Sequence, residues 1–377
     1  MRLALISHAF SFNDGQGRVN YEIARRAIDE GMDVTLVGER CADELLQFKN
    51  ARFIKLATSW QPSRFMKNLS FAIRSSHWLK RHRNDFDVIQ ANGFVSFAPM
   101  DVVAVHFVHS AWLKSPYREG AKKRLTLNSL YQEIYTRLNA RLEHHVLRHS
   151  RSIVAVSQKV ADELVSVGVD AKRITVIFNG VDPVEFHPAV GDRSSFSLPQ
   201  DVPLFLFAGD IKTTRKNFDS VLRAATLLDN AHIAVAGSVN GSPFPALAAE
   251  LKISDRIHFL GHISRMSALM TAVDGFVFPS RYDPLGLVVL EAMAAGLPVI
   301  TARTTGASAI LDDQEWTLDN PEDVQQLARL LRCLADDPEL RKRLGERNRA
   351  KAVANSWSFM TAAYLEHYWQ IFRASDR

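Results

Sequence analysis

Cysteine is scarce in this sequence of 377 residues, which contains only Cys41 and Cys333. Two cysteines so far apart give neither a disulfide framework nor a metal-binding spacing, which favours a reducing compartment. Long apolar runs are also missing, since none approaches the ~20 residues needed to cross a bilayer. Residues 1–8 predict a short strand and not a signal peptide. We therefore expect a cytoplasmic protein.

Positive charge is concentrated in one part of the chain. The formal net charge is +5, yet residues 64–151 contain fifteen Lys or Arg against six Asp or Glu. Aromatic residues such as Trp78 and Trp112 lie among the basic clusters, which include Lys80, Arg81, Arg83, Lys122, Lys123 and Arg124. A solvated surface is one interpretation, and an anionic partner or the surface of the plasma membrane is the other. Nucleic acid is not expected, because no nucleic-acid-binding motif accompanies the charge.

Apolar and helix-forming segments alternate along both halves of the chain, and its length predicts two domains. In the first half a helix is expected at 19–30, and strands at 2–7, 33–37, 87–90, 101–106, 152–157 and 175–177. Residues 182–203 are rich in Pro, Ser and Asp and predict a linker. In the second half we expect helices at 217–228, at 264–272 and after 322, and strands at 204–208, 232–237, 257–260, 275–278 and 297–301. This alternation predicts a parallel sheet covered by helices in each domain.

The segment 279–299 combines a strand end, a turn and a helix start with two carboxylates. Pro284 and Gly286 shape the turn, and a helix is predicted to begin near Gly286. The amino end of a helix suits a phosphate group. Asp283 and Glu291, with seven residues between them, can accept hydrogen bonds from hydroxyls. A sugar nucleotide carries both kinds of group, whereas the plainer interpretation is a strand-turn-helix unit with solvated acids.

Segment 279–299 resembles the acid-x7-acid signature of retaining GT-B glycosyltransferases, especially family 4. Asp283 stands where that family usually has Glu. This shorter acid implies either a different donor sugar or a lost contact. The resemblance implies that Glu291 binds the ribose, that Asp283 contacts the donor sugar, and that the phosphates meet the backbone of Leu285, Gly286, Leu287 and Val288.

Two glycine-containing loops extend the resemblance. The run 14–18 is similar to the family's Gly-Gly-x-Gly loop, with Asp14 in place of the first glycine, and its Gly15 and Gly17 would let backbone amides approach a diphosphate. The loop that begins at Gly209 resembles the one that binds the donor diphosphate. Lys216 matches the family lysine.

Asp210 replaces the usual arginine of the second loop, and we expect Arg215 to substitute for it through two hydrogen bonds to phosphate oxygens. The two cations would stabilise the charge that develops on the leaving nucleoside diphosphate. Ile263 falls in a turn similar to one whose backbone contacts the nucleotide base.

A strand-end histidine is the catalytic candidate in the first half. His106 ends an apolar strand, where the family often has a histidine facing the donor sugar and the acceptor. His109 is its rival, while His8 and Glu22 are weaker candidates. No acid or histidine at suitable spacing makes His106 a metal ligand.

The resemblance implies a GT-B fold of two Rossmann-like domains with a cleft between them. We expect an acceptor domain at 1–185, a nucleotide-sugar domain at 186–356 and a helix at 357–377 that crosses back to the first domain. The implied reaction transfers a sugar from a nucleoside-diphosphate sugar to an acceptor hydroxyl with an α-linkage, without metal or cofactor. A lipid-linked or polyanionic acceptor of lipopolysaccharide, glycolipid or exopolysaccharide assembly is expected. The alternatives are a sugar-nucleotide epimerase or hydrolase, and a sugar-nucleotide-binding subunit with impaired activity.

Overall fold

The computed structural model of the chain describes residues 1–12, 15–58, 63–118 and 127–374. The chain forms two compact units, one made of residues 1–179 together with those from Trp357 onward, and the other of residues 180–356. The second unit starts six residues before the boundary that the sequence placed between 185 and 186. We describe each unit by itself.

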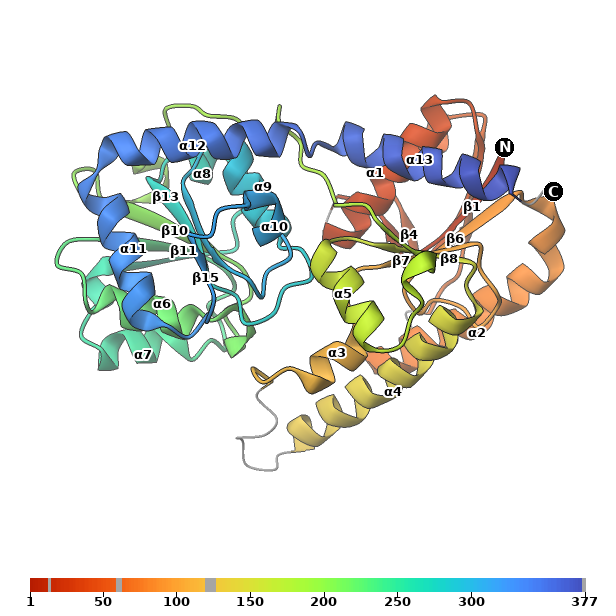
Figure 1. Cartoon of the computed structure of the whole chain (residues 1–377), viewed down its shortest axis with the longest axis horizontal. Coiled ribbons are helices and arrows are strands. Elements are labelled where there is room, and N and C mark those ends of the chain that lie inside the picture. The colour runs from red at the N-terminus through yellow and green to blue at the C-terminus, as the bar shows by residue number, and fades with distance from the viewer. Residues whose placement is uncertain (13–14, 59–62, 119–126, 375–377) are drawn as a thin grey trace. The chain divides into compact units, whose positions relative to one another are not determined.

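The first unit is built on a parallel sheet of seven strands in the order β5-β3-β1-β6-β7-β8-β9 (Figure 1). The strands are β1 (Arg2–Ile6), β3 (Asp33–Gly38), β5 (Ala51–Lys55), β6 (Val88–Asn92), β7 (Val102–Val105), β8 (Ser152–Ala155) and β9 (Ile174–Val176). A short pair, β2 (Ala9–Phe10) and β4 (Arg40–Cys41), lies outside this sheet. The sequence did not predict β5, which lies at the sheet edge and is only partly buried, so it lacks a continuous apolar run.

Helices accompany these strands in the first unit. They are α1 (Gly15–Asp29), α2 (Arg64–His82), α3 (His109–Lys114), α4 (Leu127–His149), α5 (Gln158–Ser166) and α13 (Trp357–Arg373). The prediction that the first helix begins at Val19 was wrong, because Gly15 and Gly17 already belong to α1. Glycine is costly inside a helix but is tolerated in the first turn, where the backbone N–H groups have no intrahelical partner.

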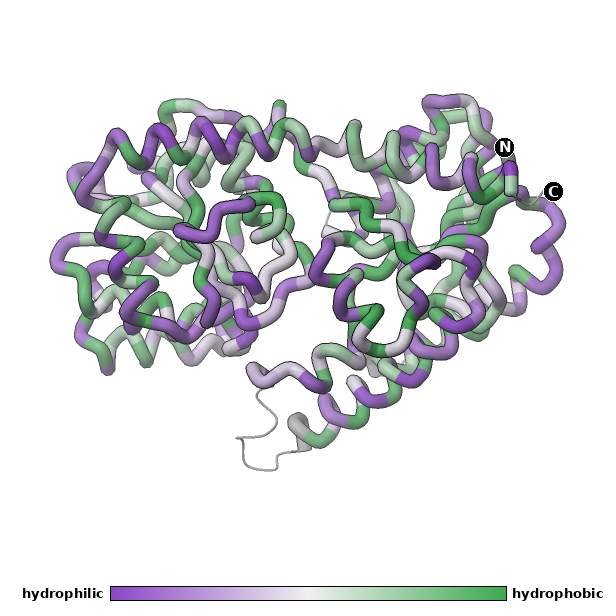
Figure 2. The backbone as a smooth tube through the Cα atoms, viewed as in Figure 1, coloured by the Kyte–Doolittle hydropathy of each residue, from purple (hydrophilic) through white to green (hydrophobic). Residues whose placement is uncertain are grey.

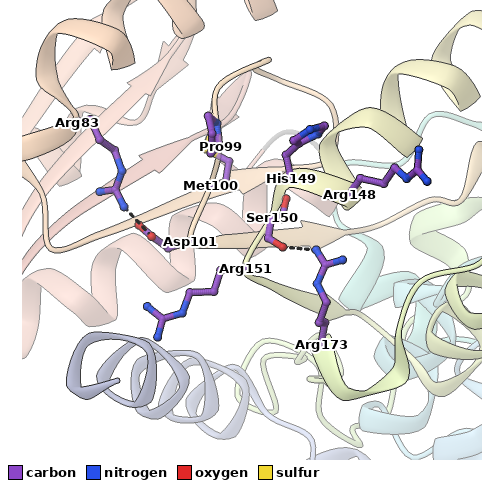
Figure 3. A pocket seen from close by; sticks show the side chains of 9 residues that line it. All are labelled: Arg83, Pro99, Met100, Asp101, Arg148, His149, Ser150, Arg151 and Arg173. Carbon is purple, nitrogen blue, oxygen red and sulfur yellow. Dashed lines mark hydrogen bonds and ion pairs between the residues drawn. The ribbon is translucent and has the colours of Figure 1, made fainter. Parts of the chain in front are cut away.

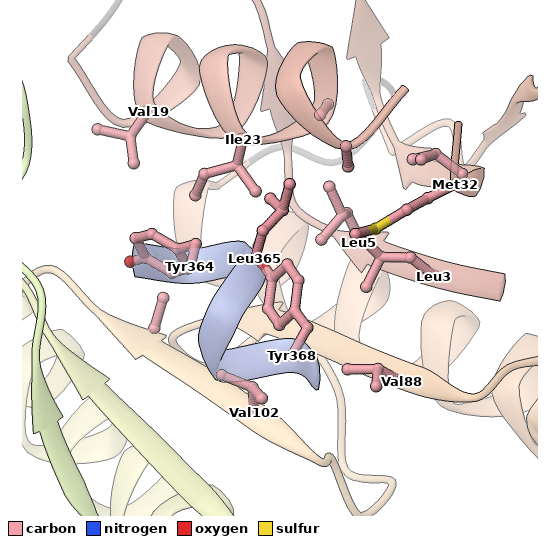
Figure 4. Packing of buried hydrophobic residues seen from close by; sticks show 14 of the residues in the cluster. Leu3, Leu5, Val19, Ile23, Met32, Val88, Val102, Tyr364, Leu365 and Tyr368 are labelled. Carbon is pink, nitrogen blue, oxygen red and sulfur yellow. The ribbon is translucent and has the colours of Figure 1, made fainter. Parts of the chain in front are cut away.

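The C-terminal helix α13 packs into the core of the first unit. Its Tyr364 and Tyr368 are fully buried in the same cluster as Val19 and Ile23 of α1 and Leu5 of β1 (Figure 4). His367, on the same helix, shares a 2.9 Å hydrogen bond with the hydroxyl of Ser152. Helix α13 is thus tied to this sheet by polar as well as apolar contacts.

The second unit has a parallel sheet of six strands in the order β12-β11-β10-β13-β14-β15. The strands are β10 (Leu204–Ala208), β11 (His232–Ala236), β12 (Ile257–Gly261), β13 (Gly275–Phe278), β14 (Val299–Ala302) and β15 (Thr317–Leu318). Its helices are α6 (Phe218–Ala225), α7 (Phe244–Glu250), α8 (Met266–Thr271), α9 (Leu287–Ala294), α10 (Ser308–Leu311), α11 (Val324–Asp336) and α12 (Pro338–Val353).

The burial of each element follows its hydropathy. Strands β10 and β13 are buried along their whole length and read as uninterrupted apolar runs, as central strands of a parallel sheet do. Helix α12 is mostly hydrophilic, as its purple stretches in Figure 2 show. Among the helices of the described segments, none is both long and apolar enough to span a membrane.

Candidate functional site

Two loops meet at the carboxyl edge of the second sheet because the strands before them are neighbours. Strands β10 and β13 are paired in parallel, with Leu206 opposite Phe276. The loop after β10 carries Arg215 and Lys216, and the loop after β13 carries Asp283. In doubly wound α/β sheets the carboxyl edge is where ligands bind.

Lys216 and Asp283 form an ion pair between these loops. The Nζ atom of Lys216 donates a hydrogen bond to Oδ2 of Asp283, and their side chains are only 13% and 12% exposed. The same ammonium lies 5.0 Å from the centre of the Phe278 ring, within range of a cation–π contact. The pair is therefore a nearly buried charge arrangement at the sheet edge.

Burial and charge act in opposite directions on this pair. Burial by itself raises the pKa of Asp283, but the Lys216 ammonium and the Arg215 guanidinium outweigh it and hold that pKa below its ordinary value. Burial lowers the pKa of Lys216, Asp283 opposes this effect and Arg215 adds to it, so that the pKa lies below its ordinary value. Asp283 is therefore ionised at neutral pH and acts as a hydrogen-bond acceptor.

Arg281 fixes the loop after β13 to helix α6. Its guanidinium donates to both carboxylate oxygens of Asp219, each at 2.8 Å, and to Glu322, also at 2.8 Å. Arg215 donates a 3.1 Å hydrogen bond to the carbonyl of Tyr282. Asn217 directly precedes α6 in the left-handed region and donates to the carbonyl of Pro279 at 2.9 Å.

The turn before α9 requires glycine. Gly286 has φ +83°, and a Cβ atom there would lie 2.8 Å from Cγ2 of Thr305. Leu285 is buried, while Leu287 and Val288 are half-buried at the start of the helix. Helix α9 thus begins directly after the Asp283 loop, and its amino end offers N–H groups and a partial positive charge.

The other donor residues predicted in the second half of the chain lie on the same edge of the second sheet. Glu291 is half-buried on α9, and Ile263 follows β12. Gly209 follows β10 with φ +156° and donates a 2.9 Å hydrogen bond to the carbonyl of Ala236. Asp210 is exposed, and its carboxylate accepts bonds from the Lys212 N–H and the Thr213 hydroxyl. Asp210 therefore serves the turn of its own loop.

His106 follows β7 directly, at the carboxyl edge of the first sheet. Its Nε2 atom is buried and has no hydrogen-bond partner among the described residues. Burial lowers the pKa of His106 to about 4. The imidazole is therefore neutral at physiological pH.

The rival histidines have partners. His109 starts α3, where Glu143 accepts a 2.9 Å bond from its backbone N–H and lies 3.2 Å from its Nδ1. Nδ1 of His8 lies 3.2 Å from Glu39. Glu22 accepts a 2.6 Å bond from Arg18 within α1. His109 is held by a structural partner, in contrast to His106.

Gly15 and Gly17 lie in the first turn of α1 and not in a loop before it. Gly17 is buried and Gly15 is exposed. Asp14, the other member of the predicted glycine loop, lies outside the described residues. No group of three or more His, Cys, Asp or Glu in the described segments is arranged to hold a metal ion.

Sequence reasoning did not find the residues that position this site. Arg281 and Asp219 are 62 residues apart, and no local pattern links them. The signal that was available is an arginine between two apolar segments, the strand 275–278 and the helix after Gly286. Such an arginine needs a partner, but only the tertiary structure identifies it.

Two family models match the chain. The one described as Glycosyltransferase Family 4 matches residues 13–185, and the one described as Glycosyl transferases group 1 matches residues 192–351. Together they leave out only the first twelve residues, six residues between the matches and the stretch after 351. Both motif-bearing loops of the second unit fall inside the second match.

Two relatives share moderate identity with the chain. The MMP alpha-(1->4)-mannosyltransferase of Mycolicibacterium hassiacum is 29% identical over 333 residues, which cover 83% of this chain and 77% of the relative. The D-inositol 3-phosphate glycosyltransferase of Streptomyces avermitilis is 32% identical over 256 residues, which cover 62% of this chain. The match spans only 55% of that second relative.

A solved structure is similar over nearly the whole chain. Anabaena Alr3699/HepE in complex with UDP-glucose matches with a TM-score of 0.73 and 17% identity, covering 98% of this chain and all of that one. This likeness shows the fold. The predicted GT-B fold, an α/β fold with two parallel sheets, is confirmed.

Proposed function

This chain is a glycosyltransferase of family 4, and we propose that it transfers a sugar from a nucleoside-diphosphate sugar to an acceptor hydroxyl with retention of the anomeric configuration. The observation that carries the proposal is the nearly buried Lys216–Asp283 pair at the amino end of α9. It puts a cation suited to a diphosphate and an acceptor suited to sugar hydroxyls side by side. The UDP-glucose held by the structural neighbour supports a donor of this class.

In the proposed reaction, the acceptor oxygen bonds to the anomeric carbon as the bond from that carbon to the phosphate oxygen breaks. Both events take place on the same face of the sugar, and the acceptor proton passes to the departing phosphate. Lys216, Arg215 and the N–H groups at the start of α9 would stabilise the charge on the leaving diphosphate. We propose that these cations make a metal ion unnecessary, which activity retained in EDTA would support.

Four further contacts belong to the proposal. Asp283, ionised at neutral pH, would accept hydrogen bonds from the donor sugar, and Glu291 would accept them from the ribose. The backbone near Ile263 would contact the base. His106 would be the contribution of the first unit to the reaction, since a neutral imidazole whose Nε2 has no partner among the residues that the structure describes can accept a hydrogen bond from a hydroxyl.

We propose that the acceptor is lipid-linked or polyanionic, of the kind used in lipopolysaccharide, glycolipid or exopolysaccharide assembly. Large apolar side chains are exposed on α2 and α4 of the basic first unit, namely Met66, Ile73, Leu130, Tyr131 and Ile134. A partner with both an apolar and an anionic part matches that surface. The name of the Streptomyces relative, which acts on an inositol phosphate, supports an anionic acceptor.

The first test asks whether a sugar nucleotide binds. A true donor raises the melting temperature by mass action, so UDP-, GDP- and ADP-sugars are screened by thermal shift. We expect one base to stand out, and no shift from any of them would overturn the proposal.

The second test compares variants of the site. Lys216→Ala and Asp283→Ala are expected to lower kcat/KM by about 10²–10³. Lys212→Ala, an exposed lysine of the same loop, is the matched control and retains full activity. Unchanged transfer in both site variants sinks the assignment. Donor turnover at the same rate with and without acceptor identifies a hydrolase or an epimerase instead.

A further inference from the structure

The Lys216–Asp283 ion pair joins two groups that have separate tasks in the proposed function. Lys216 would bind the diphosphate of the donor, and Asp283 would bind its sugar. In the structure, the Lys216 ammonium donates a hydrogen bond to Oδ2 of Asp283, and both side chains are nearly buried. Each of the two groups is therefore already a partner of the other, and a donor has to share or replace that partner.

Main-chain hydrogen bonds hold Asp283 at this place. Its N–H donates a 3.1 Å bond to the carbonyl of Thr304, and its carbonyl accepts a 3.0 Å bond from the N–H of Gly306. The N–H of Leu285 donates to its carboxylate. These bonds do not involve Lys216, so they keep Asp283 beside the ammonium even when the ion pair is broken.

The surroundings of Lys216 direct its side chain toward Asp283. A Cβ atom at Gly209 would lie 3.5 Å from Cγ of Lys216, so the stem of the lysine passes close to this glycine. The centre of the Phe278 ring is 5.0 Å from the ammonium and attracts it. Gly209 and Phe278 thus keep the ammonium in the neighbourhood of Asp283, and a phosphate that binds Lys216 comes close to this carboxylate.

The charged side chains that act most on Lys216 have formal charges that cancel its own. Arg215 is a second cation, while Asp283 and Asp210 are two anions. These four groups together carry no net charge, whereas a diphosphate carries several negative charges. A phosphate and the Asp283 carboxylate that share one ammonium repel each other, and water screens this repulsion little in a nearly buried site. Asp283 therefore weakens the binding of phosphate to Lys216.

The donor and the product of the proposed reaction differ at this carboxylate. The sugar of a sugar nucleotide carries hydroxyl groups, and an ionised carboxylate accepts strong hydrogen bonds from them. Those bonds occupy Asp283 and offset its repulsion of the phosphate. A nucleoside diphosphate has lost that sugar, and the phosphate oxygen freed in the transfer adds negative charge beside Asp283.

We propose, on the basis of the proposed function, that Asp283 makes the site bind the sugar nucleotide more tightly than the nucleoside diphosphate and so promotes product release. While the sugar is present, its hydroxyls hold the carboxylate and Lys216 holds the phosphate. Once the sugar has been transferred, Asp283 competes with the phosphate for the Lys216 ammonium. The same ion pair thus favours the donor and disfavours the product.

The test uses isothermal titration of the whole chain at constant ionic strength. Its probes are the UDP-, GDP- or ADP-sugar that gives the largest thermal shift and the nucleoside diphosphate of the same base. The measured quantity is the ratio of the Kd of the diphosphate to the Kd of the sugar nucleotide. Asp283→Asn removes the carboxylate charge at nearly equal size, and Asp283→Glu keeps it. Asp210→Asn, which neutralises an exposed carboxylate of the Lys216 loop, is the matched control.

We expect the nucleoside diphosphate to bind Asp283→Asn about tenfold more tightly than the wild type, because the repulsion is gone. The affinity for the sugar nucleotide should change little, since the same variant also weakens the hydrogen bonds to the sugar. The ratio therefore falls about tenfold in Asp283→Asn, while Asp283→Glu and Asp210→Asn keep the wild-type ratio. An unchanged ratio in Asp283→Asn, or the same fall in Asp210→Asn, overturns the proposal.

The wild type by itself provides a second test, which decides the matter if thermal melts show that Asp283→Asn does not fold. We expect the sugar nucleotide to bind the wild type at least about tenfold more tightly than the nucleoside diphosphate. Equal or tighter binding of the diphosphate overturns the role of Asp283 and leaves the proposed function standing. If no sugar nucleotide of the screen binds the wild type, the proposed function fails and this role fails with it.

Discussion

Tyr368 of α13 donates a 2.6 Å hydrogen bond to the side-chain oxygen of Gln90 on β6, a residue 278 positions earlier in the chain. Both residues are buried. One turn before it, the hydroxyl of Tyr364 is equally buried but has no partner among the described residues. The two tyrosines therefore differ in one hydrogen bond while sharing helix, burial and ring size.

That difference predicts opposite outcomes for the same substitution. Tyr368→Phe should lower the free energy of unfolding by about 1–2 kcal/mol, because Gln90 loses its partner. Tyr364→Phe should be neutral or slightly stabilising, since it removes a buried hydroxyl for which the described part of the chain offers no hydrogen-bond partner. Urea unfolding of both variants measures the difference, and equal losses would contradict it.

The turn before α9 gives a second prediction. Gly286→Ala combines a positive φ with a Cβ atom 2.8 Å from Thr305, so we expect a loss of about 2–4 kcal/mol. Gly241→Ala has a similar φ of +78° but no atom within 4 Å of the new Cβ, so only the backbone cost of about 1–2 kcal/mol remains. Thermal unfolding of the two variants separates steric from backbone strain. A cost for Gly241→Ala as large as that for Gly286→Ala would refute the steric part.

We expect Arg281, which is buried, to contribute far more to the free energy of unfolding than an exposed arginine does. Arg281→Leu leaves Asp219 without its partner, and we expect a loss of about 3 kcal/mol in unfolding experiments. Arg303→Leu breaks the exposed pair with Asp319 and should cost less than about 1 kcal/mol. Similar losses in both variants would show that the Arg281 cluster is solvated.

Because His106 is buried, we expect the free energy of unfolding to decrease as the pH falls. Its pKa is about 4 in the folded chain and near 6.5 when unfolded, so the unfolded state takes up a proton first as the pH falls. This contribution to stability is therefore fully present above pH 6.5, decreases between pH 6.5 and 4, and is lost below pH 4. The loss amounts to about 3 kcal/mol. The difference in unfolding free energy between wild type and His106→Gln, followed from pH 7 to 4, should show this slope, and a flat difference would contradict it.

The positions of most strands in the sequence could be predicted, because central strands of a parallel sheet are continuous apolar runs. Residues 204–208 and 275–278 were expected as strands and are strands. The edge strand β5 was missed because its partly exposed residues lack that run. The start of α1 was misplaced because glycine propensity was read without its position in the first turn.

In the candidate site, too, local patterns predicted some features and only the tertiary structure decided the others. Sequence motifs pointed to Lys216 and Asp283 separately, from a loop after one strand and a turn after another. Their contact depends on β10 and β13 being neighbours, although two strands lie between them in the sequence. The ion pair of Arg83 with Asp101 (Figure 3) had no motif at all, because it joins the end of α2 to the start of β7.

The sequence by itself determined the alternation of strands and helices, the family and the residue types at the carboxyl edge of the second sheet. These properties depend on local patterns of burial, turns and helix starts, which neighbouring residues specify. The tertiary structure decided which charges meet: Lys216 with Asp283, Arg281 with Asp219, and Arg83 with Asp101. Those pairings require strand order and register, which bring together residues that no local pattern connects.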